Sequence, residues 1–162
     1  MSLVDGLGTS KVIPNDFCVS LLFCRCEVLT QAPELPATTL TNACYEFMFQ
    51  DCVNLTEAPK LPATKVYDKS YVGMFMGCRN LKIAPELPAT EMKYRCYDSM
   101  FRSCTSLETP PALPAKVLDR ECYHQMFQEC TKLKEAPELP ATKMATDCYS
   151  MMFTSCENLT VA

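Results

Sequence analysis

Apolar and polar positions along the chain recur with a constant period of 26 residues. The tripeptide Leu-Pro-Ala begins, with no insertion or deletion between copies, at Leu35, Leu61, Leu87, Leu113 and Leu139. Phenylalanine recurs in the same frame at Phe23, Phe49, Phe75, Phe101, Phe127 and Phe153. A unit of 26 residues is too small to enclose a core, so its apolar positions must be buried against neighbouring copies. The pattern therefore predicts a solenoid.

Within one copy, the apolar spacing predicts two elements. Cys44, Met48 and Cys52 fall in one row at helical spacing, which predicts a short amphipathic helix over about residues 41–51. A strand of a few residues is expected at 55–58, and the two prolines that follow it, Pro59 and Pro62, must end it. The predicted fold class is an α/β repeat, a leucine-rich-repeat-type solenoid with one short parallel strand and one short helical segment per 26-residue repeat.

This period also predicts the domain organisation. Residues 1–14 are expected to form an N-terminal tail or degenerate cap, and residues 15–162 a single solenoid of about six repeats. The sequence stops inside a predicted strand, before the proline that follows in the other copies, so we expect the solenoid to be truncated there. An open end of this kind also predicts end-to-end self-association.

Composition and charge narrow the function classes. The chain has 162 residues, 48% of them hydrophobic, with a formal net charge of −4, which argues against disorder and against a nucleic-acid partner. No apolar run has the length of a transmembrane segment, and the first residues do not resemble a signal peptide. The remaining unusual features are 12 Cys, 12 Pro and no Trp.

Eleven of the cysteines occupy two columns of the repeat. One column holds Cys18, Cys44, Cys96, Cys122 and Cys148, with Ser70 in the third copy. The other, interpreted as a structural ladder, holds Cys26, Cys52, Cys78, Cys104, Cys130 and Cys156. These spacings are wrong for a zinc site, and the single close pair, Cys24 and Cys26, has no partner set. Stacked copies are close enough for disulfides, but a ladder specifies no unique pairing, so mostly free, buried thiols are expected.

Candidate catalytic residues are few. The single histidine, His124, lies in a variable polar column, and the nearby Cys122 belongs to a column expected to be buried. A general base needs an oriented partner, and no motif in the sequence supplies one. Glycine is too scarce for a phosphate-binding loop. The sequence therefore predicts no enzyme and no cofactor.

One motif resembles a known family. The stretch 45–59, with an aromatic residue and a cysteine at fixed short intervals before Leu55 and with Pro59 at its end, resembles the BspA-like leucine-rich repeats of bacterial surface proteins. The resemblance recurs six times over residues 15–162. It implies an extracellular or cell-surface location in a bacterium and a role in adhesion to host or bacterial partners.

The binding surface of a solenoid is built from side chains that do not repeat. The candidates on the predicted strand face are Lys82, Glu108, Lys134, Glu57, Glu135, Glu86 and Glu138. They favour a non-enzymatic binding or adhesion module for a protein or glycan partner, as part of a larger cell-surface protein. The alternative hypothesis, motivated by the cysteine columns, is a thiol-rich module that responds to redox conditions or binds metal.

Overall fold

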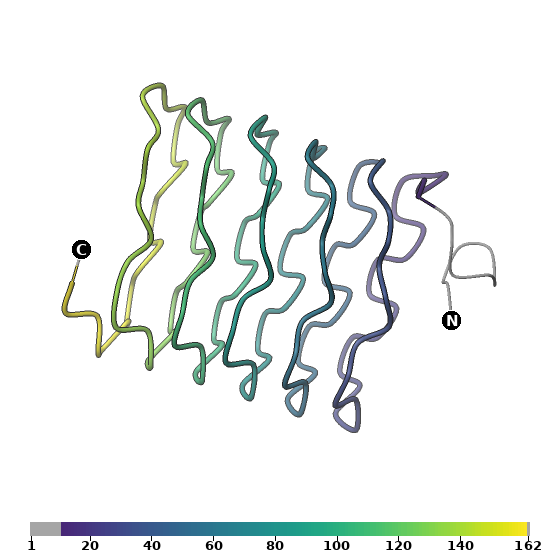
Figure 1. Ribbon diagram of the computed structural model, residues 1–162, viewed down its shortest axis with the longest axis horizontal. Coiled ribbons are helices and arrows are strands. Elements are labelled where there is room, and N and C mark those ends of the chain that lie inside the picture. The colour runs from purple at the N-terminus through teal and green to yellow at the C-terminus, as the bar shows by residue number, and fades with distance from the viewer. Residues whose placement is uncertain (1–10, 162) are drawn as a thin grey trace.

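The computed structural model describes residues 11–161, which wind into a stack of coils (Figure 1). Successive coils lie side by side along the long axis, from purple to yellow in Figure 1. Isolated parallel bridges join residues exactly one repeat apart, among them Gln31 with Glu57, Ile83 with Thr109, and Glu135 with Val161. The stacking step is therefore the 26-residue period of the sequence.

The predicted α/β fold class is wrong. Within residues 11–161 there is no helix, and the only strand-like pairings are single bridges. The segments 41–51 and 55–58, predicted to be a helix and a strand, are respectively a succession of turns and an extended stretch with one bridge. The coils are thus built almost entirely from turns and irregular extended backbone.

Overlapping turns replace each predicted helix. In the second coil the N–H of Met48 donates to the carbonyl oxygen of Tyr45, three residues earlier, at 3.2 Å. The N–H of Phe47 instead donates to the carbonyl oxygen of Val72 in the next coil, at 2.8 Å. Even-numbered residues continue the first pattern here and odd-numbered residues the second. A helix would satisfy all of its interior N–H groups internally, whereas these segments direct every second one to a neighbour.

We call these the corrugated segments and define them as residues 17–25, 43–51, 69–77, 95–103, 121–129 and 147–155. In each of them the first, fifth and ninth residues have positive φ, and sixteen of these eighteen residues are not glycine. Positive φ suits the third position of a type II turn but disfavours β-branched side chains. Consistently, none of the eighteen positions holds Val, Ile or Thr.

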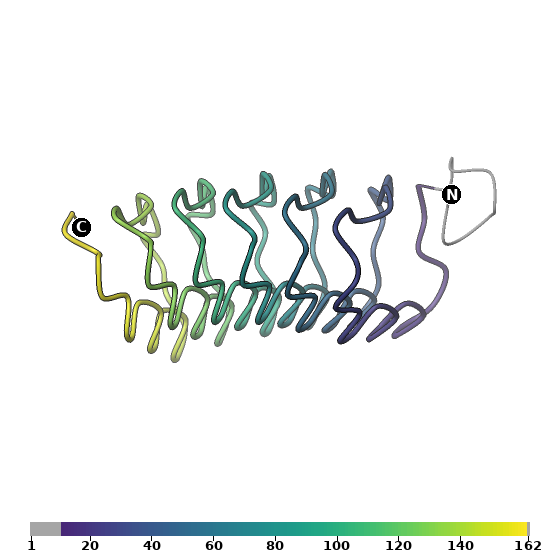
Figure 2. The same ribbon diagram turned by 90° about the horizontal axis from the view of Figure 1, so that it is seen from below.

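The other half of each coil is an extended segment, at residues 28–40, 54–66, 80–92, 106–118 and 132–144. Figure 2 shows the two halves as separate layers, with the corrugated segments forming the row of tight bends along the lower edge. Each extended segment carries prolines that lack the N–H donor of a regular ladder. This explains why neighbouring extended segments pair only at isolated positions.

The core lies between the two layers and is made of identical side chains stacked coil upon coil. Phenylalanine rings of successive coils have centroids 5.5–5.8 Å apart and interplanar angles of 1–6°. Tyrosine rings from Tyr45 to Tyr149 form a second ladder with centroids 5.5–5.9 Å apart. Leu61, Met74 and Leu81 belong to further buried columns. Burial of these repeated apolar columns, with the backbone bonds between coils, stabilises the stack.

Two glycines of the third corrugated segment are needed for close packing rather than for their φ angle. A Cβ atom added to Gly73 would lie 2.3 Å from two ring carbons of Phe47. At Gly77 it would lie 2.2 Å from a carboxylate oxygen of Asp51. The equivalent residue of the next coil, Ser99, has the same φ of 54° as Gly73 and carries a side chain. The Phe47 ring therefore occupies the space that a side chain at position 73 would fill.

We expect Gly73→Ala to destabilise the chain by about 1–3 kcal/mol, because the added methyl group displaces the Phe47 ring from the third coil. Chemical denaturation of both variants measures the change in the free energy of unfolding. In a Phe47→Ala background the same substitution should cost less than half as much, since the methyl group then meets no ring. Equal costs in the two backgrounds would contradict this explanation of the glycine.

Candidate binding surface

All seven predicted surface residues are exposed, and all lie on the extended segments. The N–H of Glu108 donates to the carbonyl oxygen of Lys82 at 3.0 Å, which places these two residues side by side on adjacent coils. Lys134 accepts in the same way from the N–H of Thr160, at 3.0 Å. The bridges that extend the same rows include Glu57 and Glu135. The variable columns thus form continuous rows across the coils.

Two of the predicted residues, Glu108 and Lys134, line one groove together with three residues that the sequence reasoning missed. The groove has a volume of about 520 Å³, and its other lining residues are Lys132, Asn158 and Thr160. Its wall carries one carboxylate, two ammonium groups, an amide and a hydroxyl. Lys132 and Asn158 occupy a single variable column two residues before the predicted one, and that variation is the signal in the sequence that could have identified them.

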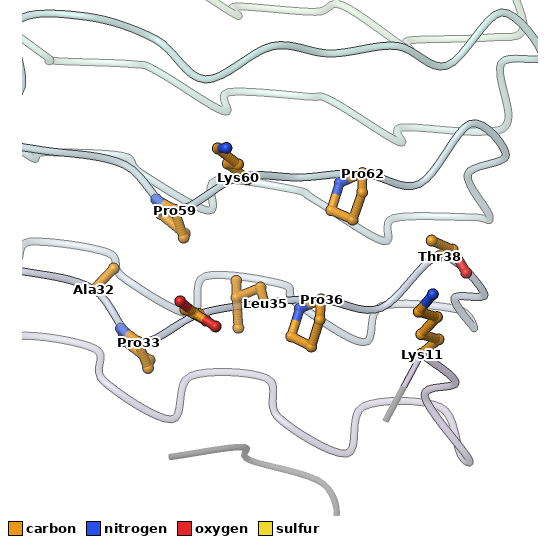
Figure 3. A pocket seen from close by; sticks show the side chains of 10 residues that line it. Lys11, Ala32, Pro33, Leu35, Pro36, Thr38, Pro59, Lys60 and Pro62 are labelled. Atoms are coloured by element: carbon orange, nitrogen blue, oxygen red, sulfur yellow. The ribbon is translucent and has the colours of Figure 1, made fainter. Parts of the chain in front are cut away.

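A second kind of groove runs between the proline columns of successive coils. Figure 3 shows the one between the first two extended segments, where Pro33 and Pro36 face Pro59 and Pro62, with Lys60 on the second segment. Its volume is about 500 Å³. Further proline grooves of about 340 and 280 Å³ include the predicted residues Glu86 and Glu138, respectively. These two residues are therefore separated from Glu108 and Lys134 by groove type.

The ladder cysteines lie in one row with their thiols turned to the backbone of the preceding coil. The Sγ of Cys78 donates to the carbonyl oxygen of Phe49 at 3.1 Å, and those of Cys104 and Cys130 contact the equivalent carbonyls at the same distance. Cys52 and Cys156 make the same contact at 3.0 Å. Of the ladder, only Cys26 in the first coil donates to no carbonyl of the described residues.

Burial changes the acid–base behaviour of these thiols. It raises the pKa of Cys52 from 9.0 to about 11 and that of Cys78 further, in each case chiefly through desolvation of the thiolate. In the other cysteine column, burial raises the pKa of Cys44 to about 11 and that of Cys96 to about 12. Such thiols remain protonated at neutral pH, and protonated thiols are poor nucleophiles and poor metal ligands. Residues 11–161 hold no group of three or more His, Cys, Asp or Glu arranged to bind a metal ion.

His124 has an oriented partner that the sequence reasoning did not find. Its Nδ1 lies 3.2 Å from Oδ1 of Asp98, the residue one repeat earlier in the same column. The Ser99 hydroxyl donates to the same carboxylate oxygen at 2.7 Å, and Nε of Arg95 lies 3.5 Å from Oδ2. The serine therefore bonds to the aspartate and not to the histidine. This is not the order in which a serine nucleophile, a histidine base and an aspartate act, because there the histidine must hold the serine proton.

Charge pairs of the same register surround this cluster. The Arg95 guanidinium binds the Glu121 carboxylate in the next coil, and this hydrogen bond raises the pKa of Arg95. The Ser103 hydroxyl likewise donates to Glu129 at 2.7 Å. Both pairs join residues one repeat apart. The cluster thus lies among contacts that hold neighbouring coils in register.

The stacked coils and the variable rows on their extended segments define a repeat protein with a surface-presenting scaffold. No family model, no curated protein and no solved structure matches the chain. Among the described residues, no helix has the length and apolar character needed to cross a membrane.

Proposed function

We propose that this chain is a non-enzymatic binding or adhesion module that presents its extended layer to a protein or glycan partner, as part of a larger protein at a bacterial cell surface. The groove formed by Glu108, Lys132, Lys134, Asn158 and Thr160 carries the proposal. It combines charges of both signs with an amide and a hydroxyl, so it suits a polar partner that donates and accepts hydrogen bonds.

The division of the repeat into constant and variable positions supports a binding role. Positions with the same apolar residue in successive coils, such as Phe75 and Phe101, are fully buried. Positions that change from coil to coil, such as Lys82 and Glu108, are exposed. A rigid scaffold with freely varying surface side chains is the arrangement by which repeat proteins acquire partners.

The thiol-based alternative is less well supported. A redox-responsive or metal-binding module needs accessible thiolates. Burial raises the pKa of nine of the cysteines, and five of them also donate hydrogen bonds to backbone carbonyls. Both features stabilise the neutral thiol. The cysteine columns therefore favour a packing role over a chemical one.

Replacing Lys82, Glu108 and Lys134 together by alanine should weaken partner binding by at least about tenfold, because the polar groove loses both a carboxylate and an ammonium group. The partner is first sought on a printed glycan array and on immobilised extracellular matrix proteins, and the affinity is then measured for each variant. All three residues are exposed, so the free energy of unfolding should change by less than about 1 kcal/mol.

The matched control replaces Lys60, Glu86 and Glu138, which line the proline grooves, by alanine. This variant should bind as the unmodified chain does. An equal loss of affinity in both triple variants, or no binding to any array component, would count against the polar groove as the site.

A further inference from the structure

Exposed large apolar side chains are concentrated in the first and last coils that the structure describes. Leu21 and Leu22 of the first corrugated segment are 52% and 50% exposed, and Met151 of the last is 56% exposed. Met144 is 63% exposed, although its column is buried in the coils before it. These side chains have the composition of the inner columns but lack the neighbouring coil that covers such columns elsewhere.

The backbone of the last corrugated segment carries donors without a partner in the described residues. In the fifth coil the N–H groups of Tyr123, Gln125 and Phe127 donate to carbonyls of the sixth. Their equivalents in the sixth coil find no acceptor within residues 11–161. With the two flanking positions, they form a row of five at Asp147, Tyr149, Met151, Phe153 and Ser155. Such a row is an open edge to which another chain can pair.

The first corrugated segment presents the complementary row. In the third coil the carbonyl groups of Ser70, Val72 and Met74 accept from the coil before it. The equivalent carbonyls of the first coil accept no hydrogen bond within residues 11–161. They belong to Asp16, Cys18, Ser20, Leu22 and Cys24. Five acceptors at one end therefore match five donors at the other, with the spacing that joins adjacent coils inside the chain.

Side chains match in the same register. Placed one step beyond the last coil, the first coil of a second copy brings Phe23 onto Phe153, which continues the phenylalanine ladder. Leu21 then meets Met151, so two exposed apolar side chains cover each other. The opposite arrangement, with two first coils together, would place carbonyl against carbonyl.

We propose that copies of this chain stack head to tail, with the first coil of one copy taking the place of the next coil of another. The contact uses two different faces and does not close on itself, so it generates open-ended oligomers. Each added copy also adds another extended layer, and the binding surfaces of the oligomer would act together on a multivalent partner.

The test measures the mass of the 162-residue chain by analytical ultracentrifugation over a range of concentrations, with a reductant present to prevent disulfides through the exposed Cys18. The unmodified chain should form a concentration-dependent series of oligomers. Leu21→Asp or Met151→Asp should weaken association by at least about tenfold, because a carboxylate would be buried against an apolar side chain. Both positions have positive φ, which aspartate tolerates, so each variant should remain folded.

A mixture of the two variants distinguishes this arrangement from others. Each variant alone should be monomeric, and the mixture should give a one-to-one dimer that grows no further, because only one intact first coil and one intact last coil remain to pair. The control Ile83→Asp, at an exposed apolar position of an inner coil, should associate as the unmodified chain does. A monomeric unmodified chain, unchanged association of both variants, or a mixture that stays monomeric would overturn the proposal.

Discussion

Alanine in place of Phe101 is expected to lower the free energy of unfolding by about 3–5 kcal/mol. The ring is fully buried and stacks on both sides, with centroids 5.8 Å from those of Phe75 and Phe127. The substitution removes apolar area and two ring contacts and leaves a cavity in the middle of the ladder. Urea denaturation followed by circular dichroism measures the change.

Phe153→Ala provides the matched control, because Phe153 stacks on one neighbour only and is half-buried. We expect it to cost less than half as much as Phe101→Ala. If the two variants were equally destabilised, stacking between coils would not be the source of the stability, and the isolated coil would have to supply it.

Raising the pH above about 9 is expected to unfold the chain within one to two pH units. Desolvation raises the pKa of nine cysteine thiols and five tyrosine hydroxyls in the folded state. Below about pH 9 these thiols are neutral in both states and the stability is complete. Above it the unfolded chain loses protons that the folded chain keeps, so the free energy of unfolding falls until each folded-state pKa is reached, for Cys44 and Cys52 at about 11.

Each buried thiol contributes about 1.4 kcal/mol per pH unit to this slope, so seven of them approach 10 kcal/mol per unit, comparable to the whole stability of a typical domain. Cys96→Ser removes one such group and should reduce the slope by about 1.4 kcal/mol per pH unit. Serine already occupies this column at Ser70, where its hydroxyl donates to the Tyr67 carbonyl at 3.0 Å. Stability that stayed constant between about pH 8 and 11 would contradict the burial of the thiols as neutral groups.

The helix prediction failed because two different structures share one pattern of buried positions. Cys44, Met48 and Cys52 are all fully buried and lie exactly four residues apart. A helix turns by more than a full circle over four residues, so a strict period of four drifts across its surface. A corrugated segment repeats every four residues, since two successive turns return the chain to the same side. The exact period of four was a usable signal, but apolar spacing over twelve residues is too short to separate it from the helical one.

The candidate site could be anticipated only in part. The sequence identified the variable columns, and Lys82, Glu108 and Lys134 are exposed on the extended layer. It could not show that Glu108 and Lys134 share a groove with Asn158 while Glu86 lies in a proline groove, because grooves depend on how far adjacent segments separate. The pairing of His124 with Asp98 was readable in principle from the 26-residue register, but its geometry required the direction of both side chains.

The sequence by itself determined the step between stacked positions and which columns belong to the core, because apolar side chains must be buried wherever they repeat. Only the tertiary structure decided the backbone conformation of each coil. Half of the N–H groups of a corrugated segment bond to carbonyls 25 residues away, as Phe49 does to Met74. Local propensities do not register a partner at that distance, and the cross-coil bonds and stacked rings stabilise positive φ angles that the isolated segment would not adopt.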